Sequence, residues 1–227
     1  PIFVAPTGEV FGSDPDTTIE LEIGTGLEAA GDLAGWRTTI NTAINIDGVQ
    51  HWQIAAATPF AGPLAELCQL GSCGIHYSGM TSRGKTIALK LAASAWSNPE
   101  PGQGLMSLWR TTDNALEASA AASNGTIMAL DDIKLADGKL IGTSLFQLTS
   151  GTSKSRSNLK QTLQKRLLWT TFVLSSGEQS LKEKIISDGG NWIPGMSVRF
   201  TDIDVTDINS HVEKVTIDEI LAGIQDN

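Results

Sequence analysis

Cysteine, histidine and tyrosine are scarce in this chain, whose 227 residues include 2 Cys, 3 His and 1 Tyr. Cys68 and Cys73 have no second Cys/His cluster beside them, which argues against a zinc site. We predict that both are buried free thiols in a reducing compartment, and therefore expect a cytoplasmic protein.

The chain also lacks a long apolar run and an excess of positive charge, and we expect no signal peptide. Its apolar runs are too short to cross a bilayer, so no membrane contact is expected. The net charge is −9, from 16 Lys+Arg against 25 Asp+Glu, so any contact with nucleic acid must be local. The hydrophobic fraction is 41%, with 23 Gly and 8 Pro, which suits one α/β domain with or without a small extension.

Residues 79–86 read G-M-T-S-R-G-K-T, the G-x-x-x-x-G-K-T pattern of a phosphate-binding P-loop. Gly79 and Gly84 allow backbone angles closed to other residues, so successive N–H groups can face one concavity. Lys85 would reach the β- and γ-phosphates of ATP, and the Thr86 hydroxyl would bind Mg²⁺. The remaining loop positions are Met80, Thr81, Ser82 and Arg83.

The alternative interpretation of this stretch is a glycine-rich turn with an accidental lysine. Its flanks argue against that alternative. Residues 74–78 precede the loop as a short, partly apolar strand, and residues 87–96 follow as a helix with Ile87, Leu91 and Ala95 on one face. Strand, loop and helix are the context that the motif requires.

The acidic pair Asp131–Asp132 is the second candidate group. It follows the apolar run 127–130, which is typical of a buried parallel strand. Ligands of open α/β sheets bind at the carboxyl ends of the strands. We therefore expect Asp131 to hold the Mg²⁺ shell and Asp132 to orient the attacking water. A solvated acid pair after a strand is common, but its position downstream of a P-loop favours the catalytic interpretation.

The whole pattern predicts an α/β fold: a P-loop NTPase core with a mainly parallel five-stranded sheet flanked by helices, plus a small β-containing N-terminal segment. The strands are expected over residues 74–78, 105–109, 126–130, 168–176 and 196–200. Helices are expected over residues 51–70, broken near Pro59 and Gly62–Pro63, and after a capping box at 216–219. Short β-like runs lie at 2–4, 9–12 and 17–24. The predicted division is 1–45 for the N-terminal segment, 46–210 for the ATPase core and 211–227 for a C-terminal helix. Because Pro1 directly precedes a strand-like run, we expect a segment of a longer protein.

Residues 150–167 hold five basic residues and no acidic residue, in a chain that is otherwise acidic. The plain interpretation is a solvated loop. The alternatives are a loop that contacts phosphates, or a source of an arginine finger, Arg156, for a neighbouring subunit. The basic residues are Lys154, Arg156, Lys160, Lys165 and Arg166.

Six segments in one order resemble the family called domain of unknown function 927. They are G-M-T-S-R-G-K-T, L-W-R-T-T-D-N-A-L-E, I-M-A-L-D-D-I, S-G-T-S-K-S-R, V-L-S-S-G-E and G-M-S-V-R-F. The resemblance covers about residues 45–205 and implies a P-loop ATPase domain of the kind found beside primase or helicase modules in phages and mobile elements. It further implies ATP hydrolysis with Mg²⁺ by a helicase-type motor in DNA replication, with Ser176 as a sensor of the nucleotide.

The partners implied by the resemblance are single-stranded or forked DNA and further copies of the chain, a hexameric ring being expected by analogy with such motors. One position departs from the family pattern: the second acid is usually Glu and here is Asp132, which is shorter by one methylene. Two alternatives therefore remain open, a nucleotide-sensing scaffold with weak or no turnover and a P-loop small-molecule kinase.

Overall fold

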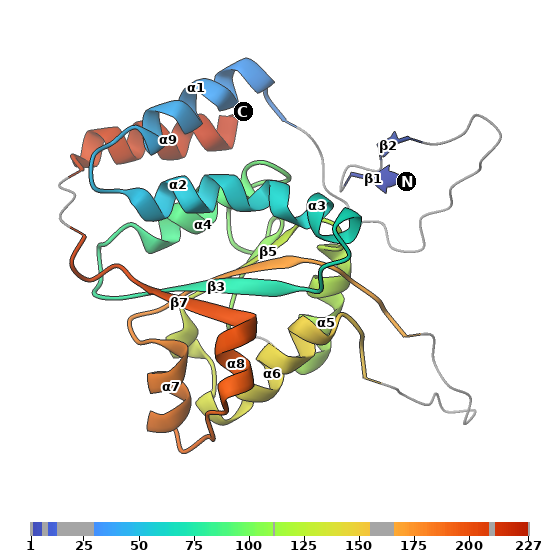
Figure 1. The fold of residues 1–227 in the computed structure, drawn as a ribbon. Coiled ribbons are helices and arrows are strands. Elements are labelled where there is room, and N and C mark those ends of the chain that lie inside the picture. Colours follow the sequence, from blue (N-terminus) through green and yellow to red (C-terminus); the bar gives the residue numbers. More distant parts are fainter. Residues whose placement is uncertain are drawn as a thin grey trace.

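A five-stranded parallel sheet forms the centre of the molecule, with helices on both faces (Figure 1). The computed structural model describes residues 2–5, 9–12, 30–110, 112–154, 166–208 and 212–226. The strand order is β4-β5-β6-β3-β7, and every neighbouring pair is parallel. The strands are β3 (Cys73–Ser78), β4 (Met106–Leu108), β5 (Ile127–Asp131), β6 (Phe172–Ser176) and β7 (Phe200–Asp204). The expected fold class is confirmed.

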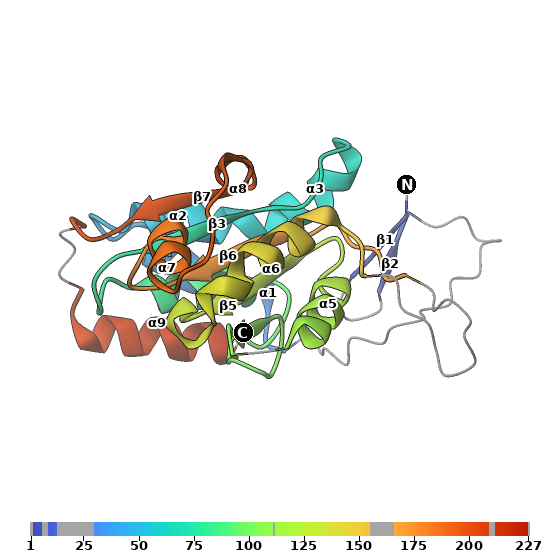
Figure 2. The same cartoon turned by 90° about the horizontal axis from the view of Figure 1, so that it is seen from below.

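Two layers of helices cover the sheet. One face carries α1 (Leu33–Ile44), α2 (Gln50–Ala57), α4 (Lys85–Ala93) and α9 (Lys214–Asp226), with α1 and α9 side by side (Figure 1). The other face carries α5 (Asp113–Ala122), α6 (Gly138–Ser150), α7 (Leu181–Ser187) and α8 (Pro194–Arg199). In the view from below, α6 and α7 lie across the near face of the sheet (Figure 2). Within the described residues no helix combines the length and the apolar character needed to cross a membrane.

Each face of the sheet has its own hydrophobic core. Trp52, Leu89 and Ile224 belong to the core under α2, α4 and α9, whereas Leu116 and Ile141 belong to the core under α5 and α6. All five residues of β5 are buried, as expected for a parallel strand with both faces covered. The two cores therefore cover the two faces of the sheet around β3, β5 and β6. The carboxyl ends of these parallel strands share one edge of the sheet.

Short elements complete the described chain. The 3-10 helices η1 (Thr58–Phe60) and η2 (Ile133–Leu135) follow α2 and β5, and α3 (Ala61–Leu67) leads towards β3. At the N-terminus β1 (Phe3–Val4) and β2 (Val10–Phe11) form an antiparallel pair, which confirms the small β-containing segment. The strand-like run predicted at 17–24 lies outside the described residues.

Several sequence predictions were wrong in detail. Residues 196–199 lie in helix α8, and the fifth strand begins only at Phe200, because Pro194 starts a helix at its first position. Residues 168–171 precede β6, where Leu168 forms an isolated antiparallel bridge with Thr152. The last helix begins at Lys214, so residues 216–219 lie inside it rather than at its cap.

The helix break predicted between 51 and 70 is confirmed at Pro59, which lies in η1, whereas Gly62 and Pro63 lie within α3. Both cysteines are free thiols, but Cys68 and Cys73 are exposed rather than buried.

Candidate nucleotide-binding site

The predicted P-loop connects β3 to α4 at the carboxyl edge of the sheet. Gly79 (φ 139°) and Gly84 (φ 73°) have the positive φ that the motif requires. Both glycines are also closely packed. A Cβ at Gly79 would lie 2.9 Å from the Thr206 nitrogen, and one at Gly84 would lie 2.7 Å from Trp52 Nε1. Larger side chains are therefore excluded by backbone conformation and by space.

Lys85 is the first residue of α4, and its side chain turns back over the loop. It is buried, and Nζ donates to the carbonyl oxygens of Gly79 and Met80, both at 2.7 Å. Burial lowers the pKa of Lys85, while the negative charges of Glu178 and Asp131 oppose this shift. The ammonium thus lies inside the curve of the loop, the position from which a lysine contacts nucleotide phosphates.

Thr86, Asp131 and Ser176 come from three elements and meet beside this lysine. The Thr86 hydroxyl lies 3.0 Å from Asp131 Oδ2, and the Ser176 hydroxyl donates to Asp131 Oδ1. The meeting follows from the strand order, because β6 lies between β3 and β5 and places Ser176 between the loop and the acid.

This donor set fits Mg²⁺. Mg²⁺ prefers hard oxygen ligands and is usually held by one or two protein groups together with substrate phosphates and waters. The Thr86 hydroxyl and the Asp131 carboxylate supply such oxygens at one point. The described residues include no group of three or more His, Cys, Asp or Glu that could hold a metal ion without a substrate.

Asp132 lies at the turn after β5, with a left-handed backbone (φ 57°). Its backbone N–H donates to Ser176 Oγ at 3.2 Å. Asp132 lines the same pocket of about 350 Å³ as Lys85, Thr86 and Asp131. Of the other predicted positions, Thr81, Ser82, Arg83, Gly84 and Ser176 also line this pocket, whereas Met80 is exposed and Arg156 lies outside the described residues.

Two residues of the pocket region were missed by sequence reasoning. Glu178 lines the pocket, and its Oε1 accepts a hydrogen bond of 2.6 Å from the Thr81 hydroxyl. That bond and the positive charges of Lys134 and Lys85 lower the pKa of Glu178. Trp52 packs against the loop from α2, and its Nε1 donates to the Gly84 carbonyl at 3.0 Å. The available signal for Glu178 was its place two residues after the end of β6, whereas no local signal identifies Trp52.

A buried hydrogen-bonded chain crosses the sheet beneath this pocket. Trp109 Nε1, which can only donate, lies 2.8 Å from Ser175 Oγ, so the serine proton is free for His76 Nδ1 at 2.7 Å. His76 Nε2 therefore carries the ring proton and donates to the Gln179 carbonyl at 3.0 Å. Burial lowers the pKa of His76 to about 4, so the ring is neutral at pH 7.

His51 is a second buried histidine near the loop. Burial lowers its pKa to about 4, with the Lys85 charge acting in the same direction. A backbone contact with Arg83 opposes this shift of the pKa, and the ring packs edge-on against Tyr77. The His51 ring is therefore neutral at pH 7.

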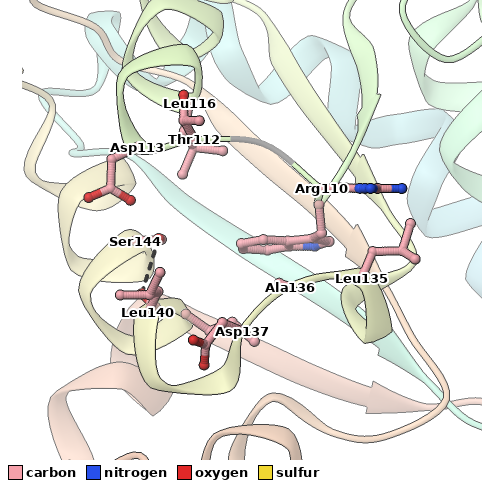
Figure 3. A pocket seen from close by; sticks show the side chains of 11 residues that line it. Arg110, Thr112, Asp113, Leu116, Leu135, Ala136, Asp137, Leu140 and Ser144 are labelled. Carbon is pink, nitrogen blue, oxygen red and sulfur yellow. Dashed lines mark hydrogen bonds between the residues drawn. The ribbon is translucent and has the colours of Figure 1, made fainter.

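A second pocket, of about 190 Å³, opens between the starts of α5 and α6 (Figure 3). Its carboxylates already have partners. Asp137 caps α6 by accepting from the Lys139 N–H, and Asp113 pairs with Lys154 Nζ at 2.7 Å. We assign this pocket to the packing of the two helices.

The basic segment is described only at its two ends. Besides its ion pair, Lys154 donates its backbone N–H to Glu117 Oε1 at 3.1 Å. The Ser153 N–H donates to the Leu167 carbonyl at 2.9 Å, which brings both ends of the segment together. Arg156, Lys160 and Lys165 lie outside the described residues, so the finger and phosphate-contact hypotheses stay predictions.

The family model "Domain of unknown function (DUF927)" matches residues 2–167. The chain belongs to this family. No curated protein matches the sequence.

Among solved structures, one described as "SCCmec type IV Cch - active helicase" has a TM-score of 0.73 at 20% identity, covering 100% of this chain and 43% of that chain. A second structure, NtrX from Brucella abortus in complex with ADP, has a TM-score of 0.46 at 14% identity and covers 87% of this chain and 43% of that chain. A third, the C-terminal region of NrS-1, has a TM-score of 0.46 at 11% identity and covers 87% of this chain and 44% of that chain. The DUF927 chain therefore shares its fold with part of the protein described as an active helicase, and it spans less than half the length of these three proteins.

Proposed function

We propose that the chain binds Mg-ATP at residues 79–86 and hydrolyses it as the motor domain of a helicase-type protein. The observation that carries the proposal is the convergence of Lys85, Thr86, Asp131 and Ser176 on one pocket. These groups come from three separate elements. A glycine-rich turn with an accidental lysine would have no reason to place a carboxylate and two hydroxyls beside that lysine.

Each side chain has a role that its chemistry supports. Lys85 exchanges its two carbonyl partners for phosphate oxygens when the nucleotide binds. Thr86 and Asp131 would hold Mg²⁺, which would supply positive charge to offset that of the phosphates. Ser176 links Asp131 to the backbone of Asp132, so it can report a change at the terminal phosphate to both acids. Asp132 accepts a hydrogen bond from the attacking water.

The partners belong to the same proposal. We infer that the motor acts on single-stranded or forked DNA during replication or mobility of a phage or mobile element, as a homo-oligomer beside primase or helicase modules. The support is membership of the family and the fold shared with a protein described as an active helicase. The division into segments at 45/46 and 210/211 stays a prediction.

The test of nucleotide binding is Lys85→Ala. Loss of a charge-assisted phosphate contact is worth roughly 1.5–3 kcal/mol, so the affinity for Mg-ATP should fall about tenfold to a hundredfold. Titration calorimetry measures it, with Lys182→Ala, an exposed lysine of α7, as the matched control. Unchanged affinity in folded Lys85→Ala protein would refute the nucleotide site.

A nucleotide-sensing scaffold is the second candidate, because Asp132 is shorter than the glutamate usual at its position. The ATPase rate with and without single-stranded DNA separates the candidates. Stimulation by DNA supports the motor, whereas binding without turnover supports the scaffold. Turnover only with a small-molecule acceptor supports the third alternative, a kinase.

A further inference from the structure

The loop that carries Glu178 is held in place on both sides of this residue. The Gly177 N–H donates to the Tyr77 carbonyl at 3.0 Å, and the Gln179 carbonyl accepts from His76 Nε2 at 3.0 Å. A side chain at Gly177 would collide with Ile133, and its Cβ would lie only 3.2 Å from the His76 ring. The backbone of Glu178 is thus fixed to the P-loop strand, although its side chain is exposed to solvent.

The glutamate lies at the end of the pocket where the terminal phosphate is expected. The Lys85 ammonium rests on the carbonyl oxygens of Gly79 and Met80, and in P-loops this lysine contacts the β- and γ-phosphates. The next residue, Thr81, is therefore close to the γ-phosphate. Its hydroxyl lies 2.6 Å from Glu178 Oε1.

We propose that Glu178 is a further catalytic residue, which orients the attacking water and accepts its proton. This inference rests on the proposed ATPase function. The water oxygen bonds to the γ-phosphorus, and the bond from that phosphorus to the β,γ-bridging oxygen breaks, leaving its electron pair on ADP. The water proton passes to the Glu178 carboxylate and from there to solvent.

The surroundings of Glu178 suit this role. The Thr81 hydrogen bond and the positive charges of Lys134 and Lys85 keep the carboxylate ionised, so that it can accept a hydrogen bond from water and orient it. Because the same groups lower the pKa of Glu178, the proton that it receives passes on to solvent rather than being retained. A glutamate also reaches one methylene further than Asp132, which lines the same pocket. Two carboxylates can then hold one water, with Glu178 as its proton acceptor.

The test is Glu178→Gln. An amide oxygen still accepts from the Thr81 hydroxyl, so the loop contact is kept while the negative charge and the base are lost. We expect the single-turnover rate of Mg-ATP hydrolysis to fall at least about a hundredfold. Removing a negative charge beside the γ-phosphate should also raise affinity for a non-hydrolysable ATP analogue about threefold to tenfold, with affinity for ADP unchanged. The matched control is Gln179→Ala, whose side chain is exposed and whose carbonyl is kept; its rate should stay within about twofold.

A Glu178→Gln rate within about threefold of wild type overturns the proposal. A wild-type protein that binds Mg-ATP without hydrolysing it overturns this inference together with the proposed hydrolysis, and leaves only nucleotide binding at the site. A wild-type protein that binds no nucleotide refutes the proposed function itself, and this inference with it. These failures are distinguishable because the wild-type binding titration is measured first.

Discussion

The buried chain through His76 makes the stability of the fold depend on pH, and His76→Gln tests this. The ring is fully buried, and its pKa is lowered from 6.5 to about 4 by burial. Below pH 6.5 the unfolded chain takes up a proton that the folded ring does not. The stabilisation of the folded chain by its neutral His76 ring is therefore fully present above pH 6.5 and is lost as the pH falls towards 4.

The size follows from the two pKa values. Between them, each pH unit changes the free energy of unfolding by up to about 1.4 kcal/mol. From pH 7 to pH 5, about 1.5 units lie within this window, so His76 alone should lower the free energy of unfolding by about 2 kcal/mol. His51, whose pKa is also lowered to about 4, should contribute a similar amount.

The assay is urea unfolding at several pH values for wild type and His76→Gln. The altered hydrogen bonds of the variant lower its free energy of unfolding by the same amount at every pH. The carboxylates titrate equally in both proteins. Neither effect therefore contributes to the difference between the pH dependences of the two free energies of unfolding. We expect the loss between pH 7 and pH 5 to be about 2 kcal/mol smaller in the variant. His51→Gln provides an independent second measurement. Identical slopes for wild type and His76→Gln would refute the neutral buried ring.

Three further outcomes are expected. Asp131→Asn should weaken the Mg²⁺-dependent part of ATP binding, whereas Asp132→Asn should keep binding and slow turnover; a wild-type rate in Asp132→Asn would show that its carboxylate does not act on the water. Gly84→Ala should lower the free energy of unfolding by about 1–3 kcal/mol in urea, because its Cβ would need a left-handed backbone and would meet Trp52; a cost near zero would contradict the tight packing. Lys154→Gln should flatten the salt dependence of single-stranded DNA binding by a slope of about 0.7 if the lysine contacts a phosphate, and an unchanged slope would leave it only its ion pair with α5.

Much of the candidate nucleotide site could be predicted from the sequence, because the residues of each motif are neighbours along the chain. The P-loop needs two glycines, a lysine and a hydroxyl at adjacent positions, and the acid pair needs only an apolar strand before it. Three of the five predicted strands, β3, β5 and β6, are mostly buried, and the apolar run of such a covered parallel strand is easily distinguished from its polar ends. Residues 196–199 show the limit of this reasoning. A run of five residues does not distinguish a period of 2 from a period of 3.6, and Pro194 together with the packing of Met196 decided for a helix.

The sequence by itself thus determined which segment carries the P-loop pattern, which strand ends in carboxylates and which class of fold contains them. Tertiary structure decided which of these groups meet. The insertion of β6 between β3 and β5 sets Ser176 beside Asp131, and the loop after β6 brings Glu178 to Thr81 across a separation of 97 residues. Trp52 reaches the Gly84 carbonyl in the same way, from a helix that precedes the loop. Sequence spacing carries no information on such contacts, because they depend on the order of strands in the sheet and on the packing of helices over it.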